Sequence, residues 1–374
     1  MEEVYMKFVC NTFDLSEACQ IVQRAASSKT ALPSVEGILL TASSGKLTLT
    51  GYDLEMGIIT EIPCSSSEEG KIVINAHMLS ETLRKLPADS VSVDADARQI
   101  ATIESGEFKT TIIGMNAEDY PELPSVSRGY DVEVSQNILK DMIRKTIFSA
   151  AVKDSKVVHT GVKFEIEPGH IRLVAVDGVR LAIRNENIDY SGEELTFVVP
   201  AKTLSEVMKL LSDEDDKIKI SVGNRHITFS IGAYYIISRL LDGEFLNYKS
   251  AIPSAAKTIA KVNTAQFLSS IDRTSLIITD RIKSPIKCVF SNDSIVMSSN
   301  ASIGASNDKI PAEITGDDIT VGFNNKYMLD ALRVCDTDEI KIMLNSPVAP
   351  ILVVPVEGDE FIFLILPVRL KNEN

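Results

Sequence analysis

Four histidines are the residues of this chain whose type most readily supports catalysis or metal binding. His77, His159, His170 and His226 stand far apart, and they fit neither an HExxH motif nor the Cys/His spacing of a zinc site. The sequence also lacks a GxxxxGK loop for phosphates, a GxGxxG turn after a strand and a GxSxG nucleophile elbow. We therefore expect no metal, no cofactor and no catalytic constellation.

Two aspartates, Asp53 and Asp177, recur at the same place in similar segments and could suggest a pair of catalytic carboxylates. Both stand where a chain reversal is expected, and turn chemistry accounts for an aspartate there. The third similar segment has Ala301 at this place. A hydrolase with an unrecognised site is the weakest interpretation, because no nucleophile can be paired with a base.

One unit of the sequence occurs three times. Residues 171–184 read as a hairpin with an Asp-Gly turn, and shifts of 124 residues in either direction reach 47–60 and 295–308. Helix-like and closing strand-like segments recur at a similar spacing, namely 78–86, 203–211 and 328–335, then 108–115, 234–241 and 361–368. The 374 residues thus predict three domains, at 1–124, 125–253 and 254–374, with proline-containing linkers at 119–124 and 244–253.

Each unit combines two helices with hairpin strands, which predicts the α+β class. The six expected helices are 12–26, 75–86, 135–153, 200–212, 263–276 and 324–335. In the third of them, Leu139, Met142, Ile143 and Ile147 form an apolar stripe. Lys140, Arg144 and Lys145 are expected on the polar side of that helix.

Charge is distributed unevenly between these helices and the rest of the chain. The formal net charge of −14 argues at first sight against a nucleic-acid partner. The six helices, however, hold 12 Lys and Arg against 7 Asp and Glu, a net of +5, which leaves −19 for everything else. Surface helices that simply carry more lysine would give the same count, so the pattern alone leaves both interpretations open.

Composition indicates a soluble cytoplasmic protein. No apolar run approaches the roughly 20 residues that cross a bilayer, and the acidic start lacks the features of a signal peptide. The five cysteines are scattered, as expected of reduced thiols.

A noncatalytic triple repeat with basic helices suits a curved body that follows a phosphate backbone without reading bases. The alternative is an open triple-repeat scaffold that binds proteins and does not encircle DNA.

Four segments, 49–56, 174–182, 199–202 and 366–370, closely resemble the bacterial sliding clamp family, the beta subunit of the replicative DNA polymerase. The resemblance runs in order from Met6 to Leu370. It implies three similarly folded domains of the DNA-clamp type, with helices on the inner side and antiparallel sheets outside. It further implies a head-to-tail homodimeric ring around double-stranded DNA, a processivity factor without enzymatic activity that tethers the polymerase.

The resemblance also implies three sets of site residues. Basic residues that would face DNA are Arg24, Lys29, Arg84, Lys153, Lys156, Lys202, Lys209, Arg273 and Arg333. A pocket for short apolar peptides would use His159, Val176, Gly178, Arg180, Leu181, Leu246, Ala251, Pro347, Val348, Leu366, Pro367, Val368 and Arg369. The dimer contact would use Lys109, Thr110, Ile112, Leu276 and Ile277. Ordinary strand core would explain most of the pocket residues equally well.

The implied partners are the polymerase alpha subunit, the clamp loader, repair polymerases, ligase and mismatch-repair proteins, in a cytoplasmic location at the nucleoid and with no membrane. Val179 and Ser250 depart from residues common in the family and bear on peptide preference, as does the tail at 371–374.

Overall fold

The computed structural model describes residues 4–27, 31–126, 129–278 and 284–370 of the chain. Lys29 and the tail at 371–374 lie outside this part. The chain forms two compact units, one made of residues up to 134 with 209–211 and 216–240, the other of the remainder. The unit division follows strand pairing, and the three domain boundaries expected from the repeat stay a prediction.

The first unit contains two antiparallel sheets and the helices α1 (Thr12–Val22) and α2 (Ala76–Leu83). The five-stranded sheet has the order β5-β1-β7-β8-β9, and the eight-stranded sheet has the order β10-β15-β16-β17-β4-β3-β2-β6. Their bounds are β1 Val4–Asn11, β2 Gly37–Ser43, β3 Lys46–Tyr52, β4 Met56–Pro63, β5 Ser65–Glu68, β6 Gly70–Asn75, β7 Ser90–Asp96, β8 Ile100–Ser105, β9 Phe108–Ile113, β10 Tyr130–Ser135, β15 Lys217–Val222, β16 His226–Ile231 and β17 Tyr234–Arg239.

The second unit contains a nine-stranded sheet, β14-β11-β12-β13-β26-β25-β24-β18-β22, and a four-stranded sheet, β21-β20-β19-β23. Their bounds are β11 Gly161–Glu167, β12 His170–Val176, β13 Arg180–Asn187, β14 Leu195–Pro200, β18 Thr258–Asn263, β19 Ile286–Ser291, β20 Ser294–Ala301, β21 Gly304–Pro311, β22 Glu313–Gly316, β23 Ile319–Phe323, β24 Glu339–Leu344, β25 Ile351–Pro355 and β26 Phe361–Ile365. The other helices of the chain are α3 Gln136–Ile147, α4 Ala201–Leu210, α5 Thr264–Thr274 and α6 Asn325–Arg333.

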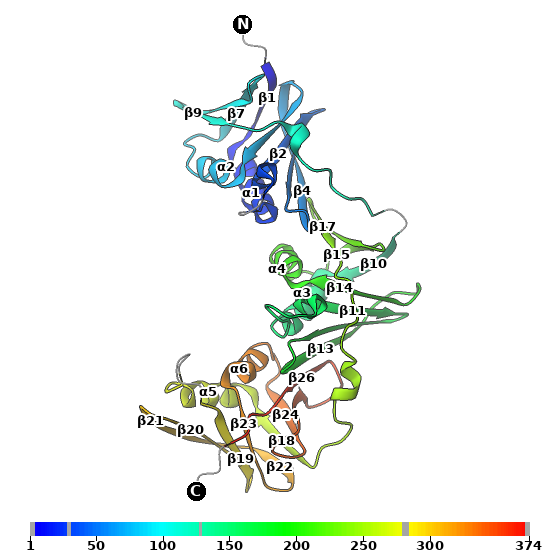
Figure 1. Ribbon diagram of the computed structural model, residues 1–374, viewed down its shortest axis with the longest axis vertical. Helices are drawn as coiled ribbons and strands as arrows, with labels where there is room; N and C mark the ends of the chain where they lie inside the picture. The colour runs from blue at the N-terminus through cyan, green and yellow to red at the C-terminus, as the bar shows by residue number, and fades with distance from the viewer. Residues whose placement is uncertain (1–3, 28–30, 127–128, 279–283, 371–374) are drawn as a thin grey trace. The chain divides into compact units, whose positions relative to one another are not determined.

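Two strand pairs join one sequence repeat to the next (Figure 1). In the first unit β17 pairs with β4, with Ile236 opposite Ile58 at the centre of the ladder. In the second unit β13 pairs with β26, with Ala182 opposite Phe363. The sheets therefore continue across repeat boundaries, and the second repeat contributes strands to both units.

All six expected helices are present, and the three hairpins at 47–60, 171–184 and 295–308 are confirmed. Four helices begin after an asparagine whose side-chain oxygen accepts a backbone N–H of the first turn, which satisfies a donor that the helix itself leaves unpaired. These caps are Asn11, Asn75, Asn263 and Asn324. Helix α3 ends at Ile147, so Lys153 lies on a loop and not in the helix expected to reach it.

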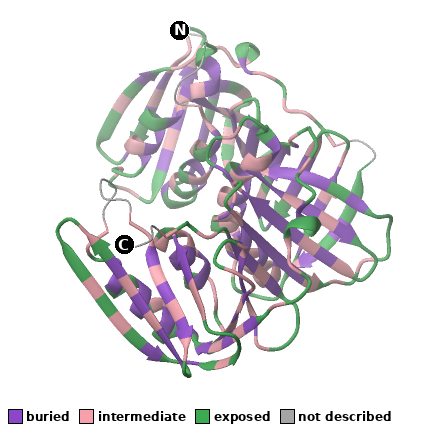
Figure 2. Cartoon of the chain, turned by 60° about the horizontal axis from the view of Figure 1, so that its bottom comes forward, coloured by how far each residue is buried: buried purple, intermediate pink, exposed green. Residues whose placement is uncertain are grey.

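Buried side chains alternate with exposed ones along many strands, as expected when one face of a sheet packs on the core (Figure 2). A large cluster in the second unit gathers Phe267, Phe290, Phe323 and Phe361, each at most 1% exposed, between α5, α6 and the adjoining sheets. Within the described residues, no helix is long and apolar enough to span a membrane.

Candidate functional site

Three segments of the second unit leave the nine-stranded sheet at the same place. Ile365, the last residue of β26, stands opposite Arg180 of β13 on one side and Ile351 of β25 on the other. The turn before Arg180, the loop before Ile351 and the segment after Ile365 therefore meet at the same end of these three strands. A backbone hydrogen bond of 2.9 Å from the N–H of Leu366 to the carbonyl of Val179 links two of them.

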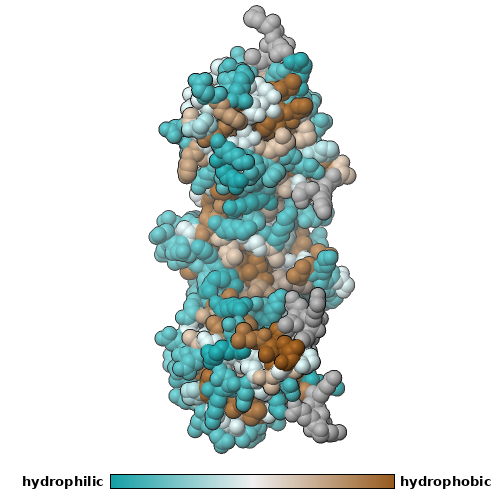
Figure 3. Space-filling view, turned by 90° about the vertical axis from the view of Figure 1, so that its left-hand side faces the viewer, coloured by the Kyte–Doolittle hydropathy of each residue, from teal (hydrophilic) through white to brown (hydrophobic). Residues whose placement is uncertain are grey.

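The place where the three segments meet has a buried apolar floor, and partly exposed apolar side chains lie on the surrounding segments. Val176 and Leu181 are each 3% exposed and pack in one cluster with Tyr248 and Leu364. The more exposed apolar side chains from the surrounding segments are Leu246 at 40%, Val348 at 65%, and Leu366 and Val368 at 39% each. Figure 3 shows that exposed apolar side chains on one face of the molecule gather in separate patches among hydrophilic ones.

The remaining residues expected in the pocket have mixed surroundings. Ala251, Pro347 and Arg369 are exposed, and Pro367 is half-buried. Gly178 has a φ of 87°, a left-handed conformation that a tight turn needs and that glycine adopts without strain. Ser250 is exposed and donates its hydroxyl to the carbonyl of Asn247.

Arg180 is fully engaged within the protein. Its guanidinium donates to Asp177 at 2.8 Å and to Asp330 of α6 at 2.7 Å, and it lies 4.7 Å from the ring centre of Tyr327. Its side chain is 12% exposed. Arg180 therefore fixes the β12–β13 turn to α6. Sequence reasoning did not find Asp330, because a contact between residues 150 positions apart leaves no local signal.

His159 lies in η4 (Val157–Thr160), beside the apolar floor. Its Nδ1 is 3.1 Å from the carboxylate of Asp154, and its ring packs edge-on against Phe245 with centroids 5.6 Å apart. The side chain is 12% exposed, and Nε2 has no hydrogen-bond partner among the described residues. A polar contact with Asp154 and a ring contact with Phe245 thus hold His159 in place.

The prediction that Lys145 lies on the polar side of α3 is wrong. Its side chain is 3% exposed, and its Nζ lies 2.9 Å from Asp336 and 3.1 Å from Asp141. Burial alone would raise the pKa of Asp141, but hydrogen bonds from Arg144, Lys145 and Arg184 and the charge of Lys145 outweigh it and hold that pKa below its ordinary value. The charge of Lys145 is neutralised inside the protein, so the positive count of the helices overstates the charge available to a partner.

The basic residues expected to face DNA are all exposed where they are described. Arg84, Arg273 and Arg333 also make ion pairs on the surface, with Glu81 at 2.8 Å, with Asp308 at 2.6 Å and with Asp272 at 3.8 Å. Lys153 and Lys156 lie on the loop between α3 and η4, next to Val152, which is 93% exposed. The remaining members are Arg24, Lys202 and Lys209.

The residues expected at the dimer contact come from an outer strand and from the turn after α5. Strand β9 is the last strand of its sheet, and Lys109 on it pairs with Glu104 at 2.6 Å. Ile112 is 4% exposed, because alternate residues of a strand face opposite sides, so its side chain is not available at this edge. Phe108 and Ile113, on the same strand, are 44% and 81% exposed. Leu276 is 79% exposed and Ile277 half-buried.

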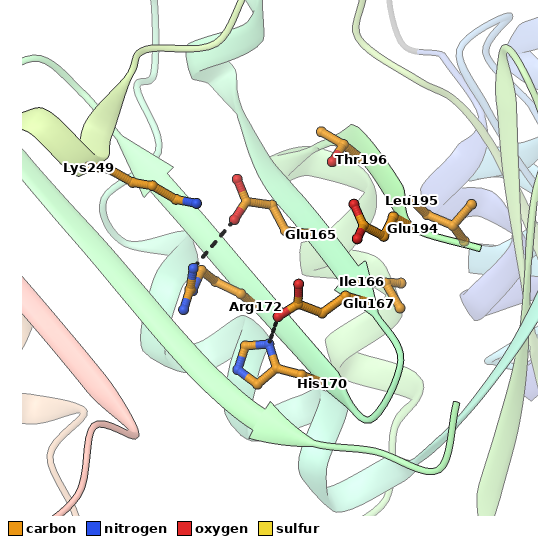
Figure 4. A pocket seen from close by; sticks show the side chains of 9 residues that line it. All are labelled: Glu165, Ile166, Glu167, His170, Arg172, Glu194, Leu195, Thr196 and Lys249. Carbon is orange, nitrogen blue, oxygen red and sulfur yellow. Dashed lines mark ion pairs between the residues drawn. The ribbon is translucent and has the colours of Figure 1, made fainter. Parts of the chain in front are cut away.

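A concavity of about 240 Å³ lies on the strands β11, β12 and β14 (Figure 4). Glu165, Arg172 and Lys249 converge on it, and Glu165 also accepts a 2.7 Å hydrogen bond from Tyr248. Burial would raise the pKa of Glu165, but hydrogen bonds from Lys163 and Tyr248 hold it below its ordinary value. Two contacts across the concavity, Glu165–Arg172 at 3.7 Å and Glu167–His170 at 3.5 Å, indicate a structural cluster of polar and charged side chains.

The two repeated aspartates make turns. Asp53 accepts from the backbone N–H groups of Glu55 and Met56 at 3.0 and 2.7 Å, and Asp177 accepts from those of Val179 and Arg180 at 3.1 and 3.0 Å. The interpretation of these residues as turn formers is confirmed. Among the described residues, no group of three or more His, Cys, Asp or Glu is arranged to hold a metal ion.

Three family models together match nearly the whole chain. They are the N-terminal, central and C-terminal domains of the DNA polymerase III beta subunit, at residues 6–124, 133–247 and 249–369. The beta sliding clamp of Bacillus subtilis is 32% identical over 97% of this chain and 100% of its own length. The crystal structure of the clamp from that species matches with a TM-score of 0.95 over 98% of this chain and all of the other. That of a putative beta subunit from Eubacterium rectale, 35% identical, matches with a TM-score of 0.93 over 97% and 99%.

Proposed function

Since this chain belongs to the DNA polymerase III beta subunit family, the beta sliding clamps, we propose that two copies close head to tail around duplex DNA and hold partner proteins there by short peptides. It is a noncatalytic processivity factor of DNA replication. The observation that carries the peptide proposal is the meeting of three segments at one end of β13, β26 and β25. A buried apolar floor lies there, with the exposed side chains of Leu246, Val348, Leu366 and Val368 on the surrounding segments.

The peptide proposal follows from burial. An apolar peptide end of the Leu-Phe type would cover these partly exposed side chains, and each large side chain that it buries contributes roughly 1.5 to 3 kcal/mol before ordering costs. Affinity from a few such contacts is moderate, so partners exchange. We assign the site to the polymerase alpha subunit, the clamp loader, repair polymerases, ligase and mismatch-repair proteins in turn, in the cytoplasm at the nucleoid.

The ring proposal rests on a free sheet edge and an exposed apolar turn. Strand β9 offers unpaired backbone groups together with Phe108 and Ile113, and the turn after α5 offers Leu276. A head-to-tail contact between these two surfaces repeats once in a closed dimer. The exposed lysines and arginines would then contact phosphates without reading sequence.

Retention on DNA tests the ring. A clamp loaded on circular DNA should stay, and the same clamp on linear DNA should slide off the ends. Equal retention on both forms would support the open scaffold instead. The double change Leu276→Asp and Ile277→Asp should give folded monomers in sedimentation and abolish retention on the circle.

Charge reversal tests the phosphate contacts. Lys153→Glu with Lys156→Glu should lower DNA affinity and reduce the slope of log affinity against log salt by about two, one for each lost contact. The control is Lys46→Glu at the start of β3, where Lys46 pairs with Glu61, and it should leave the salt slope unchanged. An unchanged salt slope in the double variant would show that the loop does not touch DNA.

Peptide titration tests the partner site. Leu366→Ala should weaken binding of a Leu-Phe peptide about tenfold. Leu54→Ala is a matched control, because Leu54 is also an exposed leucine, at 48%, and lies between β3 and β4 of the first unit. Equal affinity of both variants would place the partner site elsewhere.

A further inference from the structure

The segment at 366–370 has no regular secondary structure, yet two backbone hydrogen bonds hold it. The N–H of Leu366 donates to Val179 at 2.9 Å, and the N–H of Val368 donates to the carbonyl of Gly322 at 2.8 Å. Val179 belongs to the β12–β13 turn and Gly322 to β23. The segment is thus fixed at one point to each of two sheets.

Gly322 is buried although β23 is the outermost strand of its sheet. A Cβ at this position would lie 2.7 Å from the carbonyl oxygen of Val368, 2.7 Å from Cδ2 of Leu370 and 3.0 Å from Cγ of Leu370. Contacts this short require the neighbouring atoms to move. Closeness to the segment, and not backbone conformation, therefore requires glycine at this place.

We propose that Gly322 is a positioning residue of the peptide site: its missing side chain lets residues 366–370 lie against β23, which holds Leu366 and Val368 beside the buried floor. This inference rests on the proposed peptide function. Its physical basis is preorganisation, since a segment fixed before binding loses less conformational freedom when the peptide arrives. Gly322 itself makes no contact with the peptide.

The test is Gly322→Ala in the full-length chain, titrated with a fluorescent peptide that ends in Leu-Phe. We expect about tenfold weaker binding and faster amide hydrogen exchange at Val368, in a chain that still melts in one cooperative transition. Thr320→Ala, two residues away on β23, is the matched control and should bind as the wild type does. Normal affinity of Gly322→Ala would overturn the proposal, whether or not exchange at Val368 changes.

A second change separates positioning from general damage to the fold. Leu370→Ala removes the side chain behind two of the three short distances, so it should restore part of the affinity when combined with Gly322→Ala. Leu370→Ala alone should bind normally. Absence of any rescue would count against the proposal.

A third pair of variants leaves Gly322 in place. Val368→Pro removes both the valine side chain and the N–H that donates to Gly322. Val368→Ala also removes most of the valine side chain but keeps this N–H. Val368→Pro should bind more weakly than Val368→Ala, and equal affinities would overturn the role of this hydrogen bond. If the wild-type chain itself fails to bind the peptide, the proposed peptide site falls, and this inference with it.

Discussion

The two places where one repeat joins the next use the same backbone device but different side chains. At both, five residue pairs of an antiparallel ladder connect the strands. The paired residues of the β4–β17 junction in the first unit are all uncharged, and the hydroxyl of Thr60 donates to the carbonyl of Ala233 at 3.0 Å. The β13–β26 junction of the second unit is surrounded by ion pairs that use Arg180, Arg184 and Lys145.

The difference follows from what each junction has to hold. Strand pairing fixes how two strands run, but it leaves a turn at the end of a strand free to move. At the second junction, Arg180 fixes the β12–β13 turn to Asp330, and that turn holds Leu366 through Val179. Phe148 adds an edge-on contact with Phe363, at a centroid distance of 5.5 Å. The charged junction is thus the one beside the proposed peptide site.

The largest expected effect comes from Lys145→Ala at the charged junction. Removing this buried cation leaves a cavity and takes away one of the three cationic partners of Asp141 and one of the two of Asp336, which should lower the free energy of unfolding by about 3 kcal/mol. Urea unfolding followed by circular dichroism measures it. Lys140→Ala is the control, since Lys140 pairs with Asp213, whose side chain is 90% exposed, and should cost under about 1 kcal/mol. Similar losses would erase the contrast between buried and surface pairs.

The uncharged junction should respond to crowding. A Cβ on Gly57 of β4 would lie 2.7 Å from Cδ2 of Leu123 and 3.1 Å from Cγ2 of Ile237. We expect Gly57→Ala to destabilise the first unit by about 2 kcal/mol, measured by urea unfolding. Adding Leu123→Ala should relieve part of the overpacking. A Gly57→Ala chain as stable as the wild type would show that this junction is loosely packed.

A smaller loss is expected from Thr60→Val, which removes the hydrogen bond to Ala233 and keeps the shape of the side chain. Thr60 is 3% exposed, so the loss should be about 1 kcal/mol. Thr48→Val on β3, where Thr48 is half-buried, is the comparison. A loss as large as that of Lys145→Ala would mean that polar contacts govern both junctions equally.

The smallest effect should appear with pH. The folded protein holds the pKa of Asp141 below its ordinary value. The contribution of Asp141 to stability is therefore present above the pKa that an aspartate has in the unfolded chain, about 3.9, and is lost as pH falls through the lower pKa that Asp141 has in the folded protein. The paired residues of β4 and β17 include no carboxylate. Hydrogen-exchange protection factors between pH 6 and 3 should therefore fall more at Ala182 than at Ile58. Asp141→Asn should remove that difference, and a difference that persists would point to another group.

Local features of the fold could be predicted from the sequence. Apolar spacing located the six helices, and turn chemistry located the hairpins and explained Asp53 and Asp177. These elements depend on neighbours within a few residues, which the sequence displays directly. The alignment of the repeats with one another added that the three repeats share one order of helices and strands.

Contacts between repeats could not be predicted in the same way. Lys145 lies off the apolar stripe of its own helix, and it is buried because Asp336 approaches from 191 residues away. Ile112 and Ile113 are adjacent and chemically identical, so only the register of β9 decides which of them is exposed. The proximity of Gly322 to Leu370 likewise depends on how the last segment folds back.

The sheet that runs from β4 into β17 has a consequence for the linker at 119–124. Its ladder holds the first repeat to the second by hydrogen bonds and packing that do not pass through the linker. A protease that cuts this linker would break the covalent chain but leave the ladder whole. The two fragments should then co-elute as one body until denaturant is added, so the mechanical continuity of the protein lies in its sheets and not in its connecting peptide.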